Sequence, residues 1–305
     1  MIPAVLACAL MQAAASDAEA WRLFAQLNAP GNDQAAAWES WPNAADTFRK
    51  DGADPGPAQG LAQPGTGRFE LLTLTDFPSL RHIVKGRMVP VTDPLAAAQR
   101  LVEVRLNTVS YDFIRTRKLY TVAGQQRAVA QGAVEFPLGS IQLKAAWRPI
   151  AATERSRYHT LTLRLADGST RLYGLTALNI AAKTSSGWLW ASFEHAHAGA
   201  RQYELRGTQT SYLDADHQPV RLGNAELEGG LGNSASCMTC HARAALGVHG
   251  APARLPVFAP APPGTRRGYV GTPDPQWFGH ADAQRHWQSA YVALDFVWSL
   301  SQAAP

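Results

Sequence analysis

The chain has 305 residues, of which 46% are hydrophobic and 17% charged, and its formal net charge is +4. This is the composition of a globular protein with a full core, so it excludes a chain that is disordered throughout. Basic and acidic residues are interspersed, and the sequence therefore gives no indication of a nucleic-acid or membrane-surface site.

The N-terminal residues have the pattern of a secretory signal. Residues 2–11 are apolar, and three alanines follow at 13–15, directly before Ser16. We therefore predict a signal peptide over 1–15 and a periplasmic or secreted mature protein; a buried first helix is the alternative. The pattern leaves open whether Cys8 is lipidated and whether the start is correctly assigned. No later run approaches the ~18 apolar residues that a membrane span needs, so we expect none.

Hydrophobic spacing then predicts helices and strands in chain order. A helix is expected over 17–29, where Trp21, Phe24 and Leu27 recur at helical intervals. The Gly- and Pro-rich residues 51–67 indicate a loop. The next elements are expected to be a strand over 101–107, a helix capped by Thr108, a strand that begins near 139 and ends at Pro149, a hairpin over 158–175 that turns at Asp167-Gly168, and a strand over 187–195.

The strand predicted over 187–195 has two different faces. Alternation places Leu189, Phe193 and His195 on one face, and Trp188 and Trp190 on the other. Side chains such as Trp188 and Trp190 at this spacing are more often core or sheet-covering residues than a ligand-binding platform.

Regular patterns become sparse after about residue 222. Residues 251–264 are Pro-rich, so we expect an extended segment that wraps the body. Residues 281–300 return to helical spacing and predict a final helix. The apolar positions behind that prediction are Trp287, Tyr291, Leu294 and Trp298. Together the patterns predict an α+β fold, with a mostly antiparallel sheet, flanking helices and an irregular C-terminal region.

The most specific motif is C-x-x-C-H, formed by Cys237, Cys240 and His241. This is the attachment pattern of a c-type haem. Two thiols separated by two residues can reach the two vinyl groups on one edge of the porphyrin, and the adjacent histidine can then ligate the iron. We therefore predict one covalent haem c, with His241 as an axial iron ligand.

Three other interpretations of the two cysteines were weighed. Structural zinc needs four ligands, and His241 with a distant histidine such as His249 would have to complete the set. A redox C-x-x-C pair is expected to open a helix after a strand of a βαβ unit, which the pattern upstream does not predict. One disulfide between neighbours in sequence could not hold a large domain together.

The motif does not identify the sixth iron ligand. The candidates are His195, which shares a strand face with apolar side chains, and Met88; an open sixth position is the third possibility. Met238 lies inside the attachment loop and cannot reach the other side of the haem. The remaining histidines are expected at surface or hydrogen-bonded positions: His82, His159, His197, His217, His249, His280 and His286.

Several segments, in their order along the chain, resemble a known family. They include LKAAW, WLWASFEH, SCMTCHARA and DFVWSL, and they are similar to the secreted bacterial proteins called cytochrome c family proteins. In that family a large N-terminal body carries one C-x-x-C-H near the C-terminus. The resemblance implies a periplasmic or secreted monohaem protein, in which Cys237, Cys240 and His241 take the haem roles. Where the family often carries histidines, before KTSSG, this chain has Asn179 and Ala182.

The expected organisation is a signal peptide over 1–15, an α+β body over 16–222 and a haem-binding region over 223–305 packed on the body. We expect the haem to lie between residues 230–250 and the sheet.

Electron transfer with a redox partner protein is the first functional hypothesis. A haem enzyme or small-ligand sensor with an open or displaceable sixth site is the alternative, with Glu194, His195 and His197 as acid/base groups. A binding protein with a structural haem comes last. The sequence leaves the redox potential, the physiological partner or substrate and the oligomeric state open.

Overall fold

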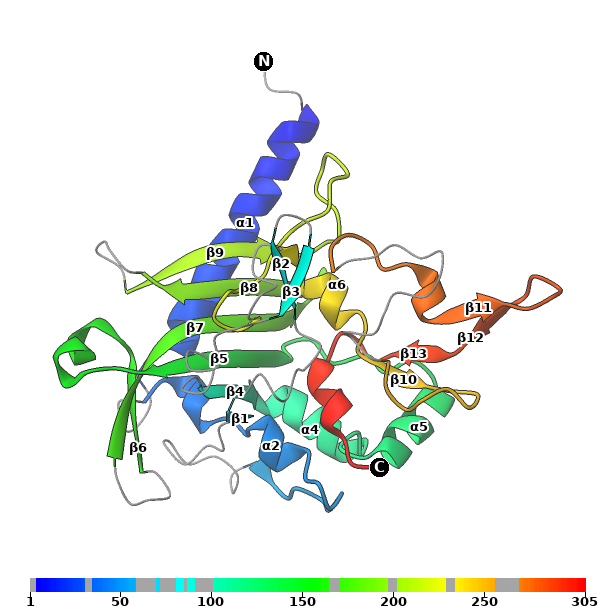
Figure 1. Cartoon of the computed structure of the whole chain (residues 1–305), viewed down its shortest axis with the longest axis horizontal. Helices are drawn as coiled ribbons and strands as arrows, with labels where there is room; N and C mark the ends of the chain where they lie inside the picture. Colours follow the sequence, from blue (N-terminus) through cyan, green and yellow to red (C-terminus); the bar gives the residue numbers. More distant parts are fainter. Residues whose placement is uncertain are drawn as a thin grey trace.

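The structure is a computed structural model of the chain (Figure 1). It describes residues 4–30, 35–58, 70–71, 81–84, 87–90, 101–164, 170–196, 202–228, 234–255 and 269–305. The fold is α+β, with a mostly antiparallel sheet and a few helices, as the sequence predicts.

An antiparallel sheet of seven strands forms the centre of the described chain. Its strands are β1 (Glu70–Leu71), β4 (Leu101–Leu106), β5 (Ile141–Pro149), β6 (Thr160–Arg164), β7 (Thr170–Thr184), β8 (Gly187–His195) and β9 (Tyr203–Gln209). Their order is β1-β4-β5-β7-β8-β9, and β6 pairs with β7. The predicted strands and the hairpin β6–β7 are confirmed, while the predicted turn Asp167-Gly168 lies outside the described residues.

The two faces of the sheet carry different hydrophobic clusters. Cross-strand register places Phe193 opposite Leu178, and Trp190 opposite Ala181. Paired residues share a face, and successive residues alternate between faces. Phe193 and Leu178 belong to one buried hydrophobic cluster, and Trp190 and Ala181 belong to a different one. The faces predicted for strand 187–195 are therefore confirmed.

Helix α1 (Ala4–Leu27) covers the first face and passes behind strands β7 to β9 in Figure 1. Trp21 and Phe24 pack on Phe193, with ring centroids 5.1 and 4.4 Å apart. The helix predicted over 17–29 is confirmed and begins further upstream. The signal peptide over 1–15 stays a prediction. Within the described residues, no helix combines the length and hydrophobicity that crossing a membrane requires.

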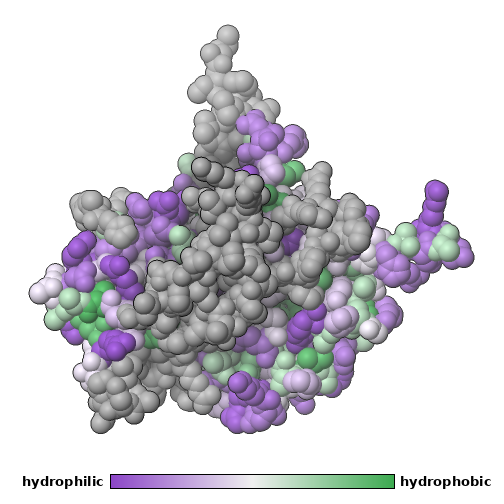
Figure 2. All heavy atoms as spheres, viewed as in Figure 1, coloured by the Kyte–Doolittle hydropathy of each residue, from purple (hydrophilic) through white to green (hydrophobic). Residues whose placement is uncertain are grey.

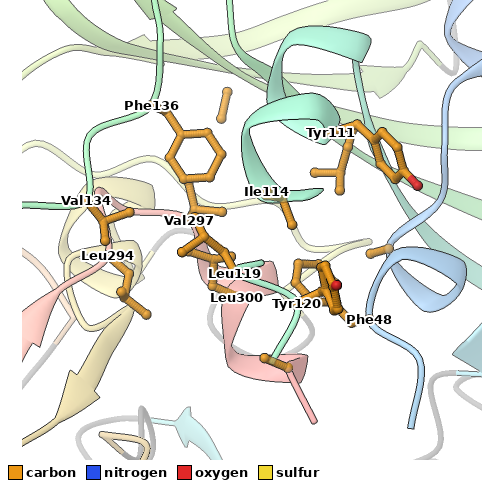
Figure 3. Close-up of a cluster of buried hydrophobic side chains, with 14 of the residues drawn as sticks. Phe48, Tyr111, Ile114, Leu119, Tyr120, Val134, Phe136, Leu294, Val297 and Leu300 are labelled. Carbon is orange, nitrogen blue, oxygen red and sulfur yellow. The ribbon is translucent and has the colours of Figure 1, made fainter. Parts of the chain in front are cut away.

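Helices and C-terminal residues pack together beside the second face. The helices are α2 (Ala44–Thr47), α4 (Thr108–Thr116), α5 (Val122–Ala130) and η7 (Trp298–Gln302). Two further short helices, η1 (Ala37–Ser40) and η4 (Ala152–Arg157), lie outside this cluster. Figure 3 shows Ile114 and Leu119 facing Val297 and Leu300 across the cluster. Residues far apart in sequence therefore share one core, and the C-terminal segment forms one of its walls.

The described residues of the C-terminal region form short elements joined by irregular segments, which confirms the irregular region that the sequence predicts. The short elements are α6 (Cys237–His241), β10 (Ala245–Gly247), η6 (Pro275–Trp277), β11 (Gly279–Ala281), β12 (Trp287–Ser289) and β13 (Tyr291–Ala293). Strand β10 pairs with β13, and β11 pairs with β12. The hairpin β11–β12 projects from the body in Figure 1, and its tip is hydrophilic in Figure 2. Strands β2 (Arg81–Val84) and β3 (Arg87–Pro90) form a separate hairpin.

Two sequence predictions need correction. Residues 281–300 do not form one helix: Trp287 pairs with Ala281 and Tyr291 pairs with Gly247, so the apolar residues belong to two different strand pairs. The cap of α4 is Asn107 rather than Thr108, because the Asn107 side chain accepts a hydrogen bond from the Ser110 amide. The Pro-rich segment 251–264 is described only to residue 255, so its predicted wrapping falls mostly outside the described residues.

Candidate functional site

The C-x-x-C-H residues form the short helix α6, which begins at a buried polar cap. The Ser236 hydroxyl accepts from the Thr239 amide at 3.2 Å. The side chain of Gln209, at the end of β9, hydrogen-bonds the Ser236 hydroxyl and accepts from the Met238 amide at 3.2 Å. These contacts satisfy amides that a helix N-terminus otherwise leaves unpaired. They attach α6 to the sheet.

Neighbouring segments hold α6 on its other sides. The Cys237 amide donates to the Leu222 carbonyl at 2.9 Å, and the Ser236 amide donates to the Tyr269 carbonyl at 2.7 Å. The Thr239 hydroxyl donates to the Gly271 carbonyl at 2.6 Å. A helix of five residues is marginal alone, so these contacts and the cap determine where its side chains lie.

His241 is held between a strand and a backbone carbonyl. Its ring lies against Trp190 of β8, with centroids 4.4 Å apart. Its Nδ1 lies 2.9 Å from the Phe296 carbonyl oxygen, which can only accept, so Nδ1 carries the proton. Burial lowers the pKa of His241 to about 4, which keeps the imidazole neutral at neutral pH. Its Nε2 consequently carries the lone pair that a metal ligand needs.

The carbonyl that holds His241 belongs to a strained turn. Asp295 and Phe296 have φ values of 49° and 65°, in the left-handed region that bulky residues rarely adopt. Each such residue costs about 1–2 kcal/mol. The Asp295 carboxylate accepts from the Phe136 amide at 2.7 Å, from Trp188 Nε1 at 3.0 Å and from Lys183 Nζ at 2.9 Å. These three partners offset the strain and fix the turn.

The two thiols of α6 are free and protonated. Neither Cys237 nor Cys240 is in a disulfide. Burial raises the pKa of Cys240 to about 12 and raises that of Cys237 well above its usual value. Cys237 Sγ donates to the Leu222 carbonyl at 3.2 Å. Because the thiolate is the reactive form, thiols with a raised pKa react slowly at neutral pH.

A group of polar side chains lies beside these thiols. Glu228 is held by the Asn224 amide at 2.7 Å and by Asn179 Nδ2 at 3.1 Å, and Lys144 Nζ lies 3.8 Å from it. Burial raises the pKa of this carboxyl. Both thiols interact electrostatically with Glu228 and Lys144, so these groups share one neighbourhood.

The chemistry of this donor set fits a covalent haem. Two free thiols on one helical turn, followed by a neutral histidine with its second nitrogen hydrogen-bonded, are the groups that a c-type haem uses. The indole N–H of Trp190, beside His241, has no hydrogen-bond partner among the described residues although the side chain is buried. A buried donor of this kind calls for an acceptor, such as a carboxylate of a ligand. Within the described residues, no three His, Cys, Asp or Glu side chains converge as a metal-ion site.

Of the two candidates for the sixth ligand, only His195 has a described side chain, and it is not brought to this helix. His195 lies on the opposite face of β8 from Trp190 and stacks on Tyr158, with ring centroids 3.8 Å apart. Its Nε2 donates to the Arg157 carbonyl at 2.8 Å. Met88 is in β3, where the structure does not describe side chains.

The other histidines either make contacts away from α6, are exposed, or have side chains that the structure does not describe. His159 pairs with Glu39 at 2.6 Å. Four more are exposed or at turns: His217, His249, His280 and His286. The side chains of His82 and His197 lie outside the described residues. Of the proposed acid/base groups, Glu194 is on the Trp190 face and ion-pairs with Arg206 at 3.3 Å.

Several residues of the site were not identified from sequence. Gln209 and Glu228 look like ordinary polar residues, and nothing near them indicates contact with α6. Phe296 acts through its carbonyl, which every residue has, so no sequence signal could have identified it.

No family model matches the sequence, and comparisons with curated proteins and with solved structures give no match. The resemblance to cytochrome c family proteins therefore remains an expectation from the residues alone.

Proposed function

We propose that this chain is an exported monohaem c-type cytochrome that transfers electrons. The haem would be attached through Cys237 and Cys240, and His241 Nε2 would be the axial iron ligand. The observation that carries the proposal is the state of His241: a neutral imidazole with Nδ1 donating to the Phe296 carbonyl, on the same short helix as two free thiols. Ligating histidines generally donate their second N–H in this way.

The chain's own residues would do three things for the bound group. The cap at Ser236 and Gln209 holds α6 on the sheet, and the Phe296 carbonyl orients His241. The buried N–H of Trp190 offers a donor to a carboxylate. When bound, the haem iron supplies reversible one-electron redox chemistry, with a potential set by axial ligands and burial.

The sixth ligand stays a prediction, with Met88 favoured over His195. His195 is stacked on Tyr158 and bonded to the Arg157 carbonyl on the other face of β8, so it would have to leave both contacts. The same proposal includes export directed by a signal peptide at 1–15, because covalent haem attachment would take place outside the cytoplasm. It also includes a redox partner protein, with which the haem would exchange electrons.

Optical spectra test the proposal directly. The full chain is co-expressed with a c-type haem maturation system in the periplasm, and spectra are recorded oxidised, reduced and reduced with carbon monoxide. We expect haem that survives denaturation, in wild type and in the exposed-histidine control His280→Ala. Cys237→Ala with Cys240→Ala should lose all covalent haem. Wild type without covalent haem would refute the proposal, and zinc analysis would follow.

The same spectra decide on the second function, a haem enzyme or ligand sensor. The observation that favours it is the Glu228 carboxyl beside the thiols: burial raises its pKa, which favours the protonated form that a proton donor needs. A low-spin spectrum that carbon monoxide does not change indicates two protein ligands and electron transfer; Met88→Ala should then open the site. A high-spin spectrum or rapid carbon monoxide binding favours the enzyme or sensor.

A further inference from the structure

The turn at Asp295 and Phe296 contains more backbone strain than a reversal of chain direction requires. Two consecutive non-glycine residues are left-handed there, at φ 49° and 65°. Strain of this kind persists only where surrounding contacts over-determine the backbone, and it gathers at functional positions. The turn therefore needs a reason, and its Phe296 carbonyl contacts the haem motif at His241 Nδ1.

The contacts that fix the turn converge on one carboxylate. The Asp295 side chain is 9% exposed and joins three parts of the body. It accepts from the Phe136 amide in the segment before β5, from Lys183 in β7 and from Trp188 in β8. Since Trp188 and Trp190 share a face of β8, the same strand supports both the turn and the His241 ring.

We propose that Asp295 is a positioning residue, which holds the Phe296 carbonyl against His241 Nδ1 and so reserves Nε2 for iron. This inference rests on the proposed haem function. The carbonyl selects the Nδ1–H tautomer, because it accepts and cannot donate. A hydrogen bond at Nδ1 also makes the imidazole a stronger donor at Nε2, which favours oxidised iron and lowers the reduction potential.

The first test needs no haem. Long-range nitrogen–proton NMR spectra of the full, haem-free, ¹⁵N-labelled chain distinguish the protonated ring nitrogen from the one with the lone pair. We expect His241 as Nδ1–H in wild type, and a mixture with Nε2–H in Asp295→Asn. The matched control is Asp282→Asn, because Asp282 also accepts several hydrogen bonds but in the projecting hairpin. An Nε2–H tautomer in wild type, or no change in Asp295→Asn, would overturn the inference.

The second test measures the reduction potential of the haem-loaded chain. It distinguishes an effect of Asp295 on the position of the Phe296 carbonyl from the effect of its negative charge on the haem. Asp295→Asn should shift the oxidised-to-reduced ratio at fixed potential about tenfold toward the reduced form, a rise of about 59 mV for one electron. Loss of a negative charge would also raise the potential. Lys183→Gln resolves this, because losing a positive charge alone lowers the potential, whereas loosening the Asp295 turn raises it.

Both variants should therefore raise the potential, with a smaller rise in Lys183→Gln, and Lys183→Arg should restore the wild-type value. A lowered or unchanged potential in Lys183→Gln would contradict positioning. If Asp295→Asn does not fold, Lys183→Gln carries both tests. If wild type takes up no haem, the proposed function fails and the assignment of Nε2 to iron fails with it, while the dependence of the tautomer on Asp295 is still decided.

Discussion

At the scale of single residues, burial controls the thiols of Cys237 and Cys240. It raises the pKa of Cys240 to about 12, against an ordinary value near 8.5. Only the thiolate reacts, so at pH 8 the folded, haem-free chain should react with a disulfide reagent roughly 10³-fold more slowly than the unfolded chain. A Cys8→Ser background limits the reaction to these two thiols. The native rate should keep rising tenfold per pH unit above pH 9, where the unfolded rate levels off; equal rates in urea and buffer would contradict this.

A second prediction at this scale concerns the buried ion pair of Glu103 and Arg105. Arg105 Nε lies 2.7 Å from the carboxylate, which also accepts from Trp147 Nε1 at 2.9 Å. Removing one partner leaves a buried charge uncompensated, so Glu103→Gln should lower the free energy of unfolding by about 3–5 kcal/mol. The double variant Glu103→Leu with Arg105→Met should lose much less. Urea denaturation measures both, and additive losses in the double variant would show that the pair is not coupled.

At the scale of elements, the cap of α6 should contribute more to the free energy of unfolding than is usual for a helix of five residues. The Ser236 hydroxyl accepts a hydrogen bond from the Thr239 amide and another from Gln209 Nε2, and both hydrogen bonds are buried. Ser236→Ala removes the cap and the buried hydrogen bonds to Gln209, which keeps only the Ser211 carbonyl and the Met238 amide as partners among the described residues, so we expect a loss of about 1–2 kcal/mol in unfolding free energy. The matched control is Ser40→Ala in an exposed turn, which should change stability by less than about 0.5 kcal/mol. Equal effects of the two changes would mean that α6 is not held by this cap.

The elements also show why some of the fold follows from sequence. Strand β8 follows a turn and carries large apolar side chains on both faces, such as Trp188 and Leu189, and both faces are buried, so its local pattern identifies it. The same reasoning misassigned residues 281–300. Trp287 and Tyr291 are four apart, which is helical spacing, yet they lie in two three-residue strands with different partners. Short strands carry too few residues for their period to be recognised.

The site divides in a similar way. Cys237, Cys240 and His241 are contiguous, so their pattern is visible without a structure. The partner of His241 is 55 residues further along and acts through its backbone. His195 was chosen because it shares a face with apolar side chains, but alternation along β8 also separates it from Trp190, the strand residue that meets His241. The face of a strand could be predicted, whereas the segment that covers each face could not.

At the scale of the molecule, residues 223–305, the predicted haem-binding region, depend on the body for their core. Leu294, Val297 and Leu300 pack with Ile114 and Leu119 of the body (Figure 3). The body also has a separate hydrophobic cluster, which packs against α1. All buried residues of this cluster lie between 20 and 203. Among the described residues of 223–305, the largest buried cluster confined to this range has three members, Ala245, Leu255 and Trp277. Burial of apolar surface is the main favourable term in folding, so the two parts should behave differently when separated.

We therefore expect the fragment 223–305 to be unfolded and to retain no haem pocket, while the fragment 16–222 keeps its sheet at reduced stability. Isolated, the C-terminal fragment loses Gln209 and Trp190, which position α6 and His241. Circular dichroism and urea denaturation of both fragments, beside the full chain, measure the difference. Co-expression with the haem maturation system adds a second readout, because a stable haem-loaded fragment 223–305 with the full-length spectrum would show an independent cytochrome domain. That result would refute placement of the haem against the sheet, since the sheet would then be unnecessary for either the ligand or its surroundings.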